Sequence, residues 1–494
     1  MTQAATYILI FLAILLFVHV FWIAYLKISE MKQRKQVALS TIKTEYLLIY
    51  ASQSGNAKYF ATQTFDQLQQ HHIAVHILDI QNVQTQHLLD ANNILFFAST
   101  YGEGDAPDTA RGFVHNIMSK SINLADKKFA ILALGDRHYA NYCQFGQQLN
   151  QWLINQHAMP LFEMVCVNDL NKDDLARWSQ QLALHTQTQF TTYQDRSHSA
   201  WQHVQLIERE LLNAGSQGLA LYRVRLSVND KLRWQSGDIV EVQCANSTEQ
   251  LHAFQTQFPE CTAEDLVHLT TKNLLNIPEK KPNQSFKQWL REIPTLGIRE
   301  YSVASIPEQG YIELVIRQHT TDGELGLGSG WMTAHSKLSE KIQIRIRSNA
   351  SFHIPDIAVP LILIGNGSGI AGLLSHLYQR EKLNHHQNWL IFGERQQQFD
   401  YLYSNELARW QASAHLPELD LVFSRDGHQD KYVKDSIHTK AEQFKTWISQ
   451  GAIICVCGSL NSMAKDVDQT LYEILGEQVM MDLIQSRRYL RDVY

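Results

Sequence analysis

Three short apolar runs, each followed at once by a loop of small and polar residues, constrain the fold of this chain more than any other feature. The runs cover residues 46–50, 94–98 and 129–134, and the loops follow as residues 51–57, 99–105 and 135–142. Continuous apolar runs this short are typical of strands buried on both faces of a parallel sheet. The carboxyl ends of such strands meet at one edge of a doubly wound sheet, where ligands bind. The sequence therefore predicts an α/β domain whose three loops converge on one ligand.

The first loop has the chemistry of a phosphate site. Residues 51–57 combine short hydroxyl side chains, a glycine and the first amides of a helix, and together these suit a phosphate dianion. A capped strand-to-helix turn without a ligand is the alternative. The second and third loops favour a ligand, because each carries a tyrosine, Tyr101 and Tyr139, able to stack on a planar ring.

In this order the three loops resemble those of the flavodoxin family, whose members bind FMN. The resemblance implies that the first loop holds the FMN phosphate through Ser52, Gln53, Ser54, Gly55, Asn56 and Ala57. It places Tyr101 and Tyr139 beside the flavin ring. It also implies a lining of Ser99, Thr100, Gly102, Gly104, Leu134, Gly135, Asp136 and Asn141, with Asp169 closing the site.

A different pattern begins near residue 219, after a polar stretch at 191–199 that suits a linker. Alternating apolar and polar residues predict a small antiparallel barrel. Within it, Arg299 can pair with a pyrophosphate and Tyr301 can stack on a flavin, although an ordinary exposed strand is the alternative. A glycine-rich loop follows and permits close approach to a phosphate through Gly326, Gly328 and Ser329. Together the two segments resemble the FAD motifs of the ferredoxin–NADP reductase family.

The last part of the chain begins with a buried strand at 360–364 and a glycine-rich turn that is typical of nucleotide-diphosphate binding. The turn contains Gly365, Gly367, Ser368 and Gly369. Further on, Ser424, Arg425, Lys431 and Tyr432 form a plausible clamp for a ribose 2′-phosphate, which favours NADPH over NADH. Exposed basic residues on a surface loop are the alternative. The related reductases have a lysine where this chain has Asp430, and Lys431 and Lys434 stand close by to compensate.

The resemblance to these reductases also implies four catalytic residues. Ser302 would bond near the flavin N5, and Cys457 would lie near the nicotinamide C4. Asp492 would stabilise positive charge that develops on the nicotinamide. Tyr494 would cover the flavin and move aside before the nicotinamide stacks there, which is a gating step.

From about residue 45 onward the chain resembles NADPH-dependent diflavin reductases, most closely the flavoprotein (alpha) subunit of bacterial assimilatory sulfite reductase. The resemblance implies electron transfer from NADPH to FAD, then to FMN, and then to a haem or iron acceptor protein. Three acceptors stay open: a sulfite reductase haemoprotein, a membrane haem protein and a ferric siderophore. A flavoprotein component of a sulfite reductase-type complex is one alternative, and a non-catalytic flavodoxin-like docking module is another.

Residues 7–26 form an apolar stretch of about 20 residues, long enough to cross a bilayer as a helix. Basic residues follow it directly, so the positive-inside rule puts the rest of the chain in the cytoplasm. A cleaved signal peptide is the alternative. The sequence thus predicts a single-pass protein of the inner (cytoplasmic) membrane. The predicted divisions are a membrane anchor (1–28), a tether (29–44), a flavodoxin-like FMN domain (45–190), a linker (191–204), an FAD-binding barrel with a shortened connecting insertion (205–356) and a Rossmann-like NADPH-binding domain (357–494).

Composition argues against a nucleic-acid-binding protein and against a disulfide or metal framework. The net charge of -6 leaves no basic stripe for nucleic acid. Six cysteines are scattered without CxxC pairs, a pattern that indicates reduced thiols and no metal site.

Overall fold

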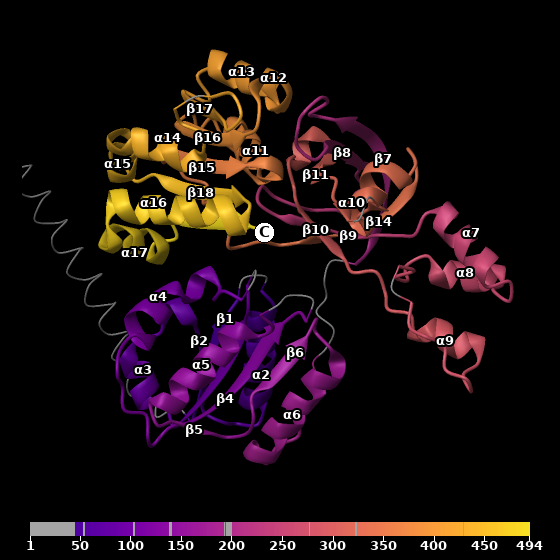
Figure 1. The fold of residues 1–494 in the computed structure, drawn as a ribbon. Coiled ribbons are helices and arrows are strands. Elements are labelled where there is room, and N and C mark those ends of the chain that lie inside the picture. The colour runs from indigo at the N-terminus through magenta and orange to yellow at the C-terminus, as the bar shows by residue number, and fades with distance from the viewer. Residues whose placement is uncertain are drawn as a thin grey trace, which may run out of the picture. The chain divides into compact units, whose positions relative to one another are not determined.

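The computed structural model describes residues 45–52, 55–101, 104–137, 141–191, 193, 200–275, 277–321, 324–427 and 429–494. The chain divides into two compact units (Figure 1). The first unit holds residues up to Ser52 and Asn56–Tyr193, and the second holds Gln53–Gly55 and Gln194–Tyr494. Each is described by itself.

In the described part of the first unit, six parallel strands form one sheet. Its order is β2-β1-β3-β4-β5, and β6 pairs with the far end of β4. The strands are β1 (Tyr46–Ala51), β2 (Val75–Asp79), β3 (Asn93–Ser99), β4 (Lys128–Gly135), β5 (Met159–Pro160) and β6 (Val165–Asn168). The three apolar runs of the sequence are β1, β3 and β4, which are neighbours, so their loops emerge side by side.

Helices cover both faces of this sheet. The helices are α2 (Asn56–Gln70), α3 (Thr85–Asp90), α4 (Arg111–Phe113), α5 (Gln144–Asn155) and α6 (Lys172–Thr186). Alternate strand residues point to opposite faces, so Leu48 packs with α2 and α6 while Leu47 packs with α3 and α5. Burial on both faces explains why the strands read as continuous apolar runs rather than alternating ones.

The second unit opens with an antiparallel barrel. Within the described residues its sheet has the order β10-β9-β14-β7-β8-β11. The strands are β7 (Gln202–Leu211), β8 (Leu221–Ser227), β9 (Ile239–Gln243), β10 (Arg299–Ser302), β11 (Tyr311–Arg317) and β14 (Lys341–Arg347). The two edge strands meet, because Val303 bridges to Leu314 just beyond β10. Trp331 and Met332, which follow the glycine-rich loop, are buried inside the barrel.

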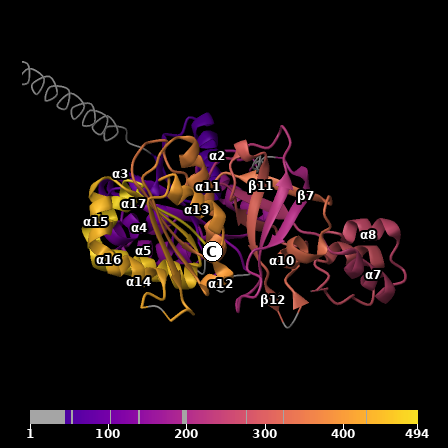
Figure 2. The ribbon, with the colours of Figure 1, turned by 90° about the horizontal axis from the view of Figure 1, so that it is seen from above.

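Two small segments are attached to the barrel. Three helices lie between β9 and β10, namely α7 (Thr248–Gln257), α8 (Ala263–Leu269) and α9 (Phe286–Glu292), and they pack around a hydrophobic cluster of their own. Figure 2 shows α7 and α8 at the end of the barrel away from the rest of the second unit. The glycine-rich loop follows the short pair β12 (Thr320–Thr321) and β13 (Glu324–Leu325), and it enters α10 (Leu327–Gly330).

The remainder of the second unit is another doubly wound domain. Its described strands form a parallel sheet of order β17-β16-β15-β18-β19. The strands are β15 (Leu361–Asn366), β16 (Asn388–Glu394), β17 (Glu418–Phe423), β18 (Ile453–Gly458) and β19 (Tyr489–Val493). The helices are α11 (Ile370–Lys382), α12 (Gln397–Asp400), α13 (Ser404–Ala412), α14 (Val433–Thr439), α15 (Ala441–Ser449), α16 (Lys465–Leu475) and α17 (Glu477–Gln485).

The barrel and this second doubly wound part share one core. Phe352 and Val315 of the barrel side belong to the same buried cluster as Leu363 and Leu374 of the doubly wound part. A buried Glu313 joins the two parts further, because it accepts hydrogen bonds from Arg225 at 2.7 Å and from the Tyr403 hydroxyl at 2.8 Å. Residues of both parts are therefore fixed relative to one another and can build one site.

The predicted mixed α/β architecture with a flavodoxin-like sheet is confirmed, and the predicted membrane localisation is wrong. No helix among the described residues is long and apolar enough to cross a membrane, since a span needs about 20 apolar residues. The predicted anchor, residues 7–26, and the tether lie outside the described residues. The described residues therefore give no support for the bilayer as a partner.

Candidate functional site

At the carboxyl edge of the first sheet lie three buried hydroxyls. Among the described residues, the Oγ atoms of Ser52 and Ser99 and the Oγ1 atom of Thr100 have no hydrogen-bond partner. They lie at the ends of β1 and β3, neighbouring strands whose ends share one edge of the sheet. A buried hydroxyl without a partner costs stability, so such a group in a folded protein needs an explanation. Three of them at one edge indicate a ligand that accepts or donates hydrogen bonds there.

The second and third loops are tied together next to these hydroxyls. The Thr100 amide donates to the Leu134 carbonyl at 2.9 Å. Gly104 has a φ of +127°, and a Cβ there would lie 2.6 Å from the Cβ of Asn141. Only glycine therefore allows the two loops to approach so closely. The structure thus brings these two predicted loops together.

The other predicted FMN residues of the first unit fall in three groups. Gly55, Asn56 and Ala57 lie at the start of α2, and Tyr101 is held in its loop by its amide, which donates to the Asp105 carbonyl at 2.9 Å. Leu134, Gly135 and Asp136 follow one another at the end of β4, where the Asp169 amide donates to the Gly135 carbonyl at 3.0 Å. Gln53, Ser54, Gly102 and Tyr139 lie outside the described residues.

In the second unit, the two predicted FAD motifs lie against each other. A Cβ on Gly328 would lie 2.5 Å from Cγ of Arg299, so the glycine leaves room for the arginine side chain. Ser329 accepts a hydrogen bond from the His319 amide at 3.0 Å, and the Gly330 amide donates to the Gly326 carbonyl at 2.7 Å. Tyr301, on the same strand as Arg299, is half-buried. The guanidinium and the glycine-rich loop thus form one face.

Three of the four predicted catalytic residues form a buried cluster. The Ser302 hydroxyl donates to Oδ2 of Asp492 at 2.6 Å, and Sγ of Cys457 lies 3.7 Å from the same oxygen. Burial raises the pKa of Asp492 above its ordinary range, although the Ser302 hydrogen bond and the positive charge of Arg347 oppose this. Burial also raises the pKa of the Cys457 thiol, so the thiol stays protonated near neutral pH.

Gly365, near the end of β15, and Gly369, in the glycine-rich turn that follows, contact the end of β18, which carries Cys457. A Cβ on Gly369 would lie 2.2 Å from the Cys457 carbonyl oxygen, and a Cβ on Gly365 would lie 2.6 Å from that atom. The end of β18 therefore packs directly on the turn that follows β15. Larger residues at either position would push Cys457 away from Asp492.

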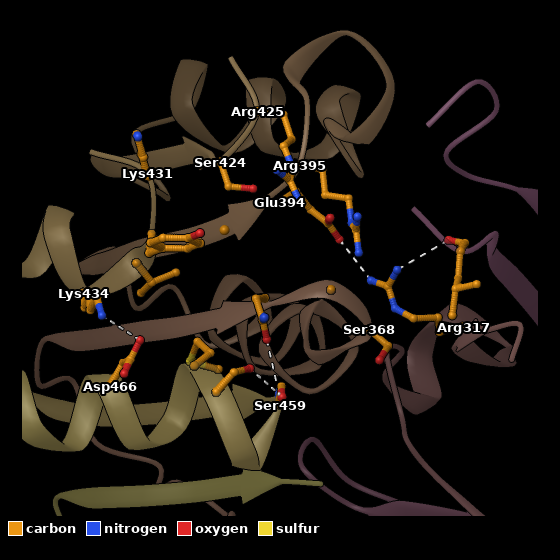
Figure 3. Close-up of a pocket in the computed structure, with 18 of the residues that line it drawn as sticks. Arg317, Ser368, Glu394, Arg395, Ser424, Arg425, Lys431, Lys434, Ser459 and Asp466 are labelled. Atoms are coloured by element: carbon orange, nitrogen blue, oxygen red, sulfur yellow. Dashed lines mark hydrogen bonds and ion pairs between the residues drawn. The ribbon is translucent and has the colours of Figure 1, made fainter. Parts of the chain in front are cut away.

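A cavity of about 800 Å³ opens between the barrel edge and the carboxyl edge of the last sheet (Figure 3). Its lining comprises Leu219, Arg317, His319, Asn366, Gly367, Ser368, Gly393, Glu394, Arg395, Ser424, Arg425, Lys431, Tyr432, Val433, Lys434, Ser459, Ser462, Met463, Asp466 and Tyr494. The predicted residues Gly367, Ser368, Ser424, Arg425, Lys431, Tyr432 and Tyr494 are thus brought together. Tyr494 is 58% exposed, and its hydroxyl lies 3.0 Å from Oγ of Ser368.

Positive charge dominates the wall of this cavity. Arg317, Arg395, Arg425, Lys431 and Lys434 all line it. Sequence reasoning missed Arg317 and Arg395. Arg395 directly follows the buried strand β16, so its place at a strand end could have revealed it. Arg317 ends the barrel strand β11, and no sequence pattern signals that it faces the last sheet.

Comparison with known proteins agrees with this geometry. Residues 48–178 match the flavodoxin family model. The first unit is flavodoxin-like. The chain is 27% identical to the NADPH sulfite reductase flavoprotein alpha-component of Vibrio cholerae serotype O1, over 90% of this chain and 87% of that protein. The proteins of that name from Photorhabdus laumondii and Yersinia pestis are also 27% identical over 90% of this chain, and 89% of each is covered.

These similarities confirm the resemblance that the sequence motifs indicate. The residues present also fit the groups that such proteins use. Buried hydroxyls without partners suit FMN at the first sheet, and Arg299 against a glycine loop suits the pyrophosphate of FAD. The cation-lined cavity suits a nucleotide that carries several phosphates.

Proposed function

We propose that this chain passes electrons from NADPH through FAD and FMN to a haem- or iron-containing acceptor protein. It is an NADPH-dependent flavoprotein oxidoreductase, and its cofactors are FAD, FMN and NADPH. The order of transfer, the roles of individual residues and the acceptor are the parts that we propose.

One observation carries the proposal: a cation-lined cavity adjoins the buried Ser302–Cys457–Asp492 cluster within one compact unit. β19 connects the two, since Asp492 belongs to the cluster and Tyr494, two residues on, lines the cavity. A dinucleotide with its phosphates among the cations can thus direct its other end toward the cluster.

The residues of the cavity would bind the dinucleotide in two places. The diphosphate would lie on the turn of Gly367 and Ser368, which precedes α11 and offers backbone amides to an anion. The 2′-phosphate would lie between Ser424, Arg425 and Lys431. A doubly charged group bound by a guanidinium, an ammonium and a hydroxyl gives charge-assisted hydrogen bonds that a 2′-hydroxyl lacks. This arrangement would favour NADPH over NADH.

The cluster would orient groups at the reacting centre. Bound flavins supply hydride and single-electron chemistry, while the chain supplies position and electrostatics. Asp492 fixes the direction of the Ser302 hydroxyl by accepting its hydrogen bond. The neutral Cys457 thiol fills the space beside them without adding a charge. When ionised, Asp492 would stabilise positive charge on the nicotinamide ring.

The hydroxyls of the first unit would bind FMN. Ser52, next to the start of α2, would donate to the phosphate, and Thr100 would bond at the edge of the ring. Tyr101 would stack on the ring from the second loop. The cofactor would thus supply the hydrogen-bond partners that the buried hydroxyls lack among the described residues.

For the acceptor, we favour a haemoprotein of the sulfite reductase type. The relatives bear the name of a sulfite reductase flavoprotein component over nearly their whole length, and this supports the choice. A non-catalytic docking module would need neither the cationic cavity nor the buried cluster, so both features count against that alternative.

The test is an anaerobic titration of the purified full chain with NADPH, with flavin content measured first. One FAD and one FMN per chain, reduced by NADPH and reoxidised by ferricyanide or cytochrome c, would support the proposal. A chain that binds both flavins but is not reduced by NADPH would contradict it. Sulfite-dependent NADPH oxidation after addition of a sulfite reductase haemoprotein would identify the acceptor class.

Replacing Tyr494 with Ala tests the gating role. Because the ring lines the cavity and its hydroxyl lies 3.0 Å from Oγ of Ser368, its loss should raise the rate with NADH about tenfold or more relative to NADPH. Steady-state kcat/KM for both nucleotides gives the ratio. A Tyr494→Phe variant keeps the ring and should behave like the native chain, whereas an unchanged ratio in Tyr494→Ala would exclude the gate.

A further inference from the structure

Arg317 reaches from the barrel onto the diphosphate turn of the nucleotide-binding part. A Cβ on Gly367 would lie 2.6 Å from Nη2 of Arg317, so the guanidinium lies directly on the turn. Nη1 donates to the Leu219 carbonyl at 3.4 Å, and the side chain is 22% exposed. Figure 3 shows the guanidinium pointing into the cavity between these contacts. Arg317 therefore stands where a diphosphate on this turn would need a cation.

The acidic partner of Arg317 is Glu394, at the end of β16. Its Oε1 lies 3.3 Å from Nη2 of Arg317, and its side chain is only 7% exposed. The other carboxylate in the lining, Asp466, is 44% exposed and pairs with Lys434 at 3.0 Å. Glu394 is thus a buried carboxylate in the wall of a cavity suited to an anion. A buried carboxylate is stable only while a cation pairs with it.

A diphosphate on the turn and the Glu394 carboxylate would compete for one guanidinium. In the described part of the chain, three charged residues face Glu394, namely Arg317 from β11, the neighbouring Arg395 and the buried Asp400 of α12. The backbone amide of Arg395 donates a hydrogen bond to the Glu394 carboxylate, whereas the charge of Asp400 repels it. Burial raises the pKa of Glu394, and Arg317 opposes that rise. If the guanidinium turns toward a phosphate, Glu394 stays buried and is still repelled by Asp400, but it loses its main favourable partner. Its pKa then rises further, and the carboxylate binds a proton more readily.

We propose that Glu394 is a specificity-determining and positioning residue for the dinucleotide: it holds Arg317 over the diphosphate turn, releases it to the diphosphate, and takes up one proton as it does so. The proton comes from solvent and forms an O–H bond on the Glu394 carboxyl, and no other bond changes. This inference rests on the proposed function, because it requires a dinucleotide diphosphate in this cavity. It makes the affinity fall as pH rises, since the proton becomes harder to take up.

Calorimetric titration with NADP⁺ tests the proposal. Titrations in two buffers of different ionisation enthalpy, repeated between pH 6 and 8.5, give the affinity and the number of protons taken up. Glu394→Gln keeps the hydrogen-bond acceptor but removes the charge. It should bind NADP⁺ about tenfold more tightly at pH 8. Its proton uptake should be lower than that of the native chain by up to one proton, because the native carboxylate is then the group that binds it.

Two controls separate this effect from general electrostatics. The first control is Glu308→Gln. Glu308 of the barrel forms an ion pair with Lys382 of α11 at 2.5 Å, so it also joins the two parts of the second unit, but it lies outside the cavity lining. This variant should bind NADP⁺ like the native chain. Adenosine 2′-monophosphate has no diphosphate, so Glu394→Gln should not bind it more tightly.

Arg317→Met provides a second variant. Without the guanidinium, Glu394 lacks its main favourable partner both before and after the ligand binds, so proton uptake should be smaller than in the native chain and affinity should fall about tenfold. Unchanged affinity and unchanged proton uptake in Glu394→Gln would overturn the inference. If the native chain binds neither NADP⁺ nor adenosine 2′-monophosphate, the proposed function itself fails, and that result is distinct from the first.

Discussion

The two parallel sheets of this molecule offer different chemistry at the same topological position. Both place a turn and a helix start after a central strand, β1 in one and β15 in the other. At the first sheet the donors are buried hydroxyls such as Ser52 and Thr100. At the second they are cations such as Arg317 and Arg425 around an open cavity.

The difference suits two kinds of ligand. Buried hydroxyls and amides bind a phosphate in a site that excludes water, and such a ligand stays bound. Cations around an open cavity attract an anion from solution and release it again, at a rate that depends on salt. We therefore expect the first sheet to hold a resident cofactor and the second to exchange a substrate, and four predictions test this contrast.

The largest effect is expected from the double variant Ser52→Ala, Thr100→Val. Both changes remove a buried hydroxyl from the first site, and FMN affinity should fall roughly 100-fold or more, because each lost hydrogen bond to a charged or polar group costs about 1–3 kcal/mol. Flavin released on denaturation measures FMN and FAD per chain. FAD content should not change. As a matched control, Ser179→Ala removes a buried hydroxyl that bonds to Leu175 within α6, and it should leave FMN content as it is.

Next in size is Arg425→Gln in the cationic cavity. A lost charge-assisted hydrogen bond of about 1.5–3 kcal/mol lowers kcat/KM for NADPH roughly 10- to 100-fold. The value for NADH, which has no 2′-phosphate, should stay the same. Arg409→Gln removes an arginine paired with Glu381 outside the cavity lining and serves as the control. An equal loss with both nucleotides would assign Arg425 to another part of the ligand.

Asp492→Asn is expected to slow flavin reduction by NADPH about tenfold, since a neutral amide stabilises developing positive charge less well. Burial raises the pKa of Asp492, so the native rate should fall as pH drops through that raised pKa, where the carboxylate is lost. The asparagine variant should lack this acid limb. Stopped-flow absorbance between pH 5 and 8 measures both. FMN binding at the first sheet should be unaffected.

The smallest effect is that of salt. Raising ionic strength from about 0.05 to 0.3 M shortens the screening length, so the Kd for NADP⁺ should rise a few-fold. The affinity for FMN should hardly change, because its predicted donors are buried hydroxyls rather than exposed cations. Equal salt dependence at the two sites would remove the contrast drawn above.

Sequence patterns predicted the local elements of both sites well. A loop such as 99–105 directly follows the strand that positions it, so the local sequence is enough to predict where the loop lies. The Ser302–Asp492 hydrogen bond joins residues 190 apart, and motif resemblance alone suggested that they share a function. The Arg317–Glu394 pair joins residues 77 apart and belongs to neither motif, so it needed the structure. Contacts between separately folded layers depend on how the layers pack, which periodicity does not encode.

The sequence also could not show whether the hydroxyls of the first site have hydrogen-bond partners. Ser52, Ser99 and Thr100 were expected in the site on the strength of resemblance, yet serines and threonines at strand ends commonly bond to nearby backbone. In the part of the chain that the structure describes, these three have no hydrogen-bond partner. That observation favours a ligand-binding loop over an ordinary capped turn.

The helices α7, α8 and α9 have a consequence for how this molecule melts. Their cluster includes Phe254 and Trp289, with ring centroids 6.2 Å apart, and it is separate from the barrel core. Both ends of the insertion are held together by the pairing of β9 with β10, in which Arg299 lies opposite Val242. The insertion can therefore open as a small cooperative unit while the barrel stays folded. Hydrogen exchange should reveal it as a foldon less protected than the strands that anchor it.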